Sequence, residues 1–124
     1  MDRMRIYIEK YGWVVDVYTS VYRENVPMLV GALKGAGAEG EALRAACENI
    51  GWADNGLTYT NGHHSVVVVS HATSINEFAN TLVHELNHVC SDIENVCSVD
   101  PHGEEASYLI GDLMSVIIKG MAHK

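Results

Sequence analysis

The sequence predicts an α+β fold, in which helices pack on a small and mostly antiparallel sheet. Short runs rich in β-branched and aromatic residues occur in two pairs, each joined by a turn. Helical signals follow each pair, as caps, prolines or apolar repeats of three and four residues. The predicted order is therefore β-β-α-α-β-β-α-α. At 124 residues, residues 1–124 are expected to form a single domain.

The first half of the chain contains a predicted hairpin of strands 5–8 and 13–18. Pro27 suits the first turn of a helix, so residues 28–34 are predicted to be helical. Residues 41–49 form a compact amphipathic helix, which the glycine at position 51 stops.

The second half begins with predicted strands 57–60 and 65–70, which the hairpin signal Asn61-Gly62 joins. Four consecutive valines make the second strand apolar on both faces, so we expect it to be covered on both sides, at least in part. We also expect this strand to present an edge to which an extended peptide adds by main-chain hydrogen bonds. A helix over 75–92, a loop over 93–103 and a helix over 104–118 complete the chain.

The helix over 75–92 has the clearest local signals. Ser74 is followed three residues later by Glu77, the pattern of a capping box. Neither proline nor glycine interrupts the segment. Apolar residues then recur at steps of three and four, which predicts one buried face; they are Ile75, Phe78, Leu82, Leu86 and Val89.

This helix carries the sequence His84-Glu85-Leu86-Asn87-His88, a match to H-E-x-x-H. Residues four apart share one face of a helix, so His84 and His88 are able to bind the same cation. Glu85 then stays free to act as a general base on a metal-bound water. The alternative reading is a helix with two surface histidines and one solvated glutamate.

A catalytic zinc ion usually has three protein ligands. The sequence offers several third ligands after the histidine helix, and spacing leaves the choice open: His102, Glu104, Glu105 and Cys97. A glutamate on the next helix gives a His-His-Glu site, and ligands on helices are held more rigidly than ligands on loops.

The chain resembles the gluzincin metallopeptidases, in particular the small minigluzincin-like proteins of bacteria and phages. The resemblance rests on the H-E-x-x-H helix and on residues 104–111, Glu-Glu-Ala-Ser-Tyr-Leu-Ile-Gly, which depart from the family pattern at Ser107. It implies a zincin-like fold and a Zn²⁺ site of His84, His88 and Glu104, with Glu105 as the reserve ligand. It also implies a peptidase that hydrolyses a peptide or protein substrate with Glu85 as its general base.

An oxyanion formed during hydrolysis needs a further stabilising group near the metal, such as tyrosine, histidine or arginine. Tyr108, on the last predicted helix, is the candidate that we assign to catalysis. Four histidines are further candidates: His63, His64, His71 and His102.

Composition restricts the other function classes. The net charge of −8 argues against nucleic acids and anionic membranes, which select basic surfaces. No run of 18 apolar residues and no apolar signal core occur, so we expect a cytoplasmic protein. The small size leaves little room for a second subdomain. The alternative function is therefore an inactive zinc-binding or regulatory module that retains the metal helix, and a third possibility is an accessory protein without metal.

Overall fold

Four strands form one mixed sheet in the computed structural model, which describes residues 1–122. The strand order is β1-β2-β4-β3, and the strands are β1 (Asp2–Ile8), β2 (Trp13–Val21), β3 (Gly56–Asn61) and β4 (His64–Ser70). Each hairpin is antiparallel, whereas β2 and β4 run parallel. The α+β class and the order of the elements are confirmed, and the sheet is mixed because the two hairpins join through a parallel pairing.

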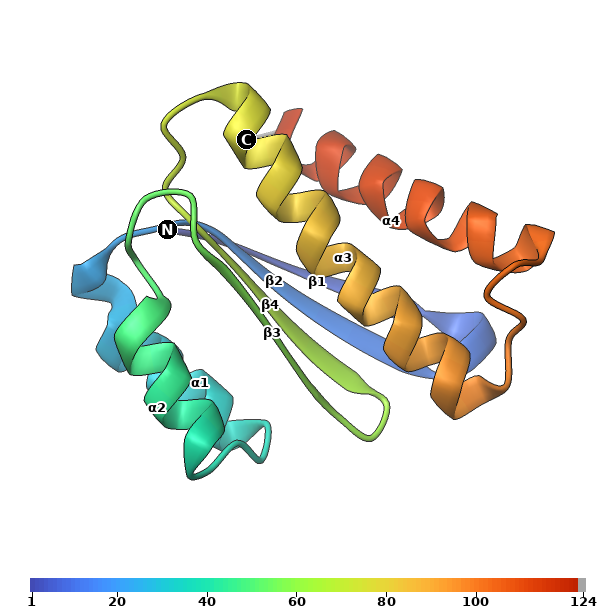
Figure 1. Ribbon diagram of the computed structural model, residues 1–124, viewed down its shortest axis with the longest axis horizontal. Coiled ribbons are helices and arrows are strands. Elements are labelled where there is room, and N and C mark those ends of the chain that lie inside the picture. Colours follow the sequence, from blue (N-terminus) through green and yellow to red (C-terminus); the bar gives the residue numbers. More distant parts are fainter. Residues whose placement is uncertain (123–124) are drawn as a thin grey trace.

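The helices cover both faces of this sheet (Figure 1). They are α1 (Val26–Gly35), α2 (Glu41–Asn49), α3 (Ile75–Cys97) and α4 (Glu104–Ala122). The helices α1 and α2 pack on one face, and α3 and α4 pack on the other. The valines of β4 alternate between the two cores, so the expected cover on both sides of this strand is confirmed. Within residues 1–122, none of the helices has the length and apolar character that a membrane span requires.

Helix α3 starts where the sequence predicts but ends later. The Ser74 hydroxyl accepts a hydrogen bond from the backbone N–H of Glu77, as the predicted cap requires. The helix continues five residues beyond position 92, to Cys97, and Ser98 ends it with a left-handed backbone (φ 57°). The expected loop over 93–103 is therefore shorter, because Ile93 and Cys97 continue the apolar stripe into the core.

The edge strand beside the histidine helix is β3. Strand β4 lies between β2 and β3, so the expectation that residues 65–70 present an edge is wrong. The open edge on this side of the sheet belongs to β3, and α3 packs against this strand (Figure 1).

Candidate functional site

His84 and His88 project from the middle of α3 into solvent, one helical turn apart. Their Nε2 atoms are 3.3 Å apart, and the two rings are almost perpendicular, at 85°. Two histidine nitrogens that bind one tetrahedral zinc ion at about 2.05 Å lie about 3.3 Å from each other. The pair therefore has the separation that two ligands of one zinc ion require.

Glu85 points the other way, toward β3, and is only 6% exposed. The Thr58 hydroxyl donates to Glu85 Oε1 at 2.8 Å and also lies 3.1 Å from the Glu85 carbonyl oxygen. Opposite Glu85 Oε2 is Gly56, where a Cβ atom would lie only 2.8 Å from that oxygen. A glycine at this position allows the carboxylate to lie directly against the strand.

A polar cleft of about 440 Å³ lies where the start of β3 meets α3. His84 and Glu85 both line it. The other lining residues are mostly uncharged and polar, and include Asn55, Asn80 and Thr81. The cleft also contains Asp54, whose pKa is lowered by hydrogen bonds from the backbone and side chain of Thr73. One imidazole and two carboxylates, Glu85 and Asp54, thus line a cleft that is open to solvent and lies beside the β3 edge.

The predicted third ligand is not part of this arrangement. Within residues 1–122, no three His, Cys, Asp or Glu side chains form a group able to hold a metal ion. Glu104 instead lines a groove beside β1. The reserve ligand Glu105 binds Lys10 Nζ at 2.6 Å and accepts a hydrogen bond from the Tyr11 hydroxyl, and both contacts lower its pKa. The set His84, His88 and Glu104 is therefore not assembled in this structure.

The length of α3 explains this separation. The helix continues nine residues from His88 to Cys97, which is about 13 Å at 1.5 Å per residue. Helix α4 starts just beyond that end and runs back along α3 (Figure 1). Glu104 in the first turn of α4 is consequently far from the histidine pair along the helix axis.

The candidate oxyanion groups also lie in other surroundings. Tyr108 is 66% exposed on α4 and lines the same groove as Glu104. Each of the four candidate histidines has other contacts: His63 stacks on Trp13, His64 bonds to Asp16, His71 stacks on Tyr22, and the backbone N–H of His102 donates to Asp100. Neither Tyr108 nor any of these four histidines forms a hydrogen bond to His84, Glu85 or His88.

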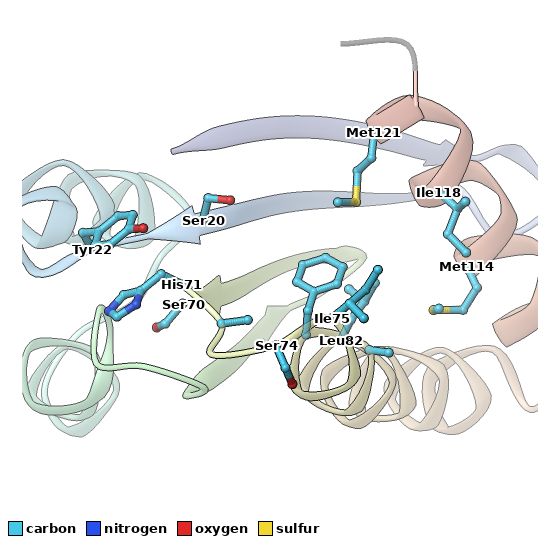
Figure 2. Close-up of a pocket in the computed structure, with 13 residues that line it drawn as sticks. Ser20, Tyr22, Ser70, His71, Ser74, Ile75, Leu82, Met114, Ile118 and Met121 are labelled. Carbon is cyan, nitrogen blue, oxygen red and sulfur yellow. The ribbon is translucent and has the colours of Figure 1, made fainter.

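A larger hollow that the sequence does not indicate lies at the N-terminal end of α3 (Figure 2). It has a volume of about 690 Å³ and is mainly apolar. Ile75, which is 83% exposed, lines it together with Met114 and Ile118 of α4. His71 stands at its other side, stacked on Tyr22 with 4.3 Å between ring centroids. The histidine pair does not line this hollow, so we distinguish it from the polar cleft.

No protein-family model matches the chain, and no curated protein or solved structure matches it significantly. The gluzincin resemblance therefore rests on the motif residues alone, and the functional argument rests on the geometry around α3.

Proposed function

We propose that the chain is a zinc-binding domain of the zincin type that acts on peptides, with His84 and His88 as its metal-binding side chains. The observation that carries this proposal is the 3.3 Å separation of the two Nε2 atoms, which suits two ligands of one tetrahedral ion. The pair supplies two of the three usual protein ligands. The remaining positions are left to water or to a bound molecule.

Peptide hydrolysis is the activity that the cleft supports best. Zinc held by His84 and His88 would supply a coordinated water with a pKa lowered to about 7 and a Lewis acid for a peptide carbonyl. Glu85 lines the same cleft, and the Thr58 hydroxyl occupies its Oε1 atom. Of the two carboxylate oxygens, Oε2, which lies beside Gly56, would be the one to accept and return a proton, as a general base does.

The substrate class that fits is an extended peptide. The outer edge of β3 has no neighbouring strand among the described residues, so its backbone N–H and C=O groups are able to pair with an added strand. Thr58 on this strand contacts Glu85, so a peptide on the β3 edge passes beside the polar cleft. Main-chain pairing then supplies affinity without requiring one particular side chain.

A second candidate function is a non-catalytic zinc-binding module. The absence of a three-residue metal group within residues 1–122 favours it, because a two-histidine site leaves the ion dependent on an outside donor. Glu85→Gln separates the two candidates. In a peptidase this variant retains zinc and loses hydrolysis, whereas in a module neither protein hydrolyses peptides.

Metal content of the purified full chain tests the proposal directly. We expect about one zinc ion per chain by elemental analysis, and a loss of zinc affinity of at least about a hundredfold in His84→Ala and in His88→Ala. Asn95→Ala is the matched control, because Asn95 is exposed on the same helix and is expected to change nothing. Failure of the wild type to take up added zinc, or an equal loss in Asn95→Ala, would overturn the zinc site.

A further inference from the structure

A groove of about 570 Å³ lies at the opposite edge of the sheet, between β1 and the exposed side of α4. We propose that this groove binds an extended basic peptide segment, which adds to β1 as a fifth strand and directs lysine or arginine side chains toward α4. The site is separate from the cleft beside β3, so the proposal does not depend on zinc binding or hydrolysis.

The edge of β1 is open and only partly protected. Among the described residues β1 pairs with β2 alone, so the backbone groups of residues 6–8 have no strand partner on the outer edge. Charged side chains commonly protect such edges from added strands. The groove borders residues Ile6, Tyr7 and Ile8, none of which is charged. Arg5, the nearest cation earlier on the strand, is held by Asp16 through two hydrogen bonds of 2.8 and 3.0 Å.

The charge of the groove selects a basic partner. Exposed carboxylates line it at Glu9, Glu104 and Asp112. Within residues 1–122 none of the three forms a salt bridge, because the lysine of the groove, Lys10, is engaged by Glu105. A peptide with basic side chains therefore gains ion pairs that the protein itself does not supply.

The spacing along α4 matches an extended strand. Glu104, Tyr108 and Asp112 are four residues apart, all are exposed, and all line the groove. Four helical residues span about 6 Å, and two strand residues span about 6.6 Å. Alternate side chains of one strand therefore meet these three residues in turn. The outer two positions meet carboxylates, and the middle one meets a tyrosine ring, which also attracts a cation.

The length of the groove sets the length of the segment. Its lining on α4 runs from Glu104 to Val116, which is about 18 Å of helix. An extended chain covers this distance in about five or six residues. A hexapeptide of alternating lysine and threonine is therefore a sufficient probe.

The test is a fluorescence anisotropy titration of the full chain with labelled Lys-Thr-Lys-Thr-Lys-Thr. We expect it to bind at low salt, with the Glu-Thr peptide of equal length binding at least about tenfold more weakly. Asp112→Asn and Glu104→Gln are each expected to weaken the lysine peptide about threefold to tenfold. Glu48→Gln is the control, because it makes the same change in net charge at an exposed position on α2.

Three results would overturn the proposal. One is an affinity loss in Glu48→Gln equal to that in Asp112→Asn, which would mean general attraction to an acidic protein. Another is undiminished binding of a lysine peptide whose alternate backbone nitrogens are methylated, since methylation prevents pairing with the β1 edge. The third is no binding of the lysine peptide at millimolar concentration.

Discussion

Replacing Gly56 with alanine is expected to destabilise the protein, because the new methyl group enters space that α3 already fills. A Cβ atom at this position lies 2.8 Å from Glu85 Oε2, 2.8 Å from Thr81 Cγ2 and 2.9 Å from Glu85 Cγ. Carbon atoms in good contact are about 3.5–4.0 Å apart, so each carbon contact is too short by about 0.6 Å or more. Either the Glu85 side chain moves, or α3 shifts away from β3.

The size of the effect follows from what must move. Overpacking of this kind typically costs about 1–3 kcal/mol. Movement of the Glu85 carboxylate also breaks its hydrogen bond from Thr58, which contributes about 1 kcal/mol. We therefore expect the free energy of unfolding to fall by about 2–4 kcal/mol, which corresponds to a Tm lower by about 8–15 °C in a domain of this size.

Urea unfolding and thermal melts of four variants measure this effect: Gly56→Ala, Glu85→Ala, the double variant of the two, and Gly111→Ala. Gly111→Ala is the control, because nothing lies within 4 Å of its Cβ position on exposed α4, and alanine there is expected to stabilise the helix by about 0.5–1 kcal/mol. In the double variant Gly56→Ala with Glu85→Ala, part of the loss is expected to be recovered, because two of the three close atoms are removed.

An unchanged urea midpoint in Gly56→Ala would refute this reasoning. It would mean that Glu85 is not pressed against β3, and the arrangement of the polar cleft would then be different from the one described. If the stability losses of Gly56→Ala and Glu85→Ala simply add in the double variant, the two residues are not in contact as described, since residues in contact are expected to be coupled.

Two further predictions concern acid stability and thiol reactivity. Burial favours a higher pKa for Asp16, but the hydrogen bonds and charges of Arg5 and His64 outweigh this effect and lower the pKa. The ionised Asp16 therefore stabilises the fold at neutral pH, and this stabilisation is lost as the pH falls below about 4. Urea midpoints from pH 7 to pH 3 are expected to fall less steeply for Asp16→Asn than for wild type, and parallel curves would contradict this. Burial raises the pKa of the Cys90 thiol to about 12. Iodoacetamide at pH 8 is therefore expected to modify exposed Cys47 first and Cys90 only after unfolding. Mass spectrometry of the labelled peptides measures this order.

Local signals in the sequence were sufficient for most of the fold. The start of α3 follows from the Ser74 cap, and the bounds of α2 follow from one amphipathic repeat that ends near a glycine. Both signals act between neighbours in the chain, so no knowledge of tertiary packing is required. The same applies to the β3–β4 hairpin, which its Asn61-Gly62 turn specifies.

The edge of the sheet was predicted wrongly because it depends on long-range pairing. A hairpin signal specifies that β3 and β4 pair, but it does not specify which of them docks on β2. The four valines of β4 indicate that β4 is the strand that docks on β2, since a strand that is apolar on both faces lies inside a sheet. Thr58 and Thr60 give β3 the polar character of an edge, and their hydroxyls bind carboxylates on α3.

The choice of Glu104 as third ligand depended on its distance from the histidine pair along the axis of α3, which the spacing of the motifs in the sequence does not specify. Because α3 continues nine residues beyond His88, an antiparallel partner at the level of that histidine lies about nine residues into α4, near Leu113, which is buried. For Glu104 to reach the pair, the C-terminal part of α3, from Ile93 to Cys97, must unwind. Unwinding from Ile93 onward exposes a fully buried side chain, at a cost of about 1.5–3 kcal/mol. We therefore expect Glu104→Gln to leave zinc affinity unchanged, with the third position filled by water or by a bound peptide.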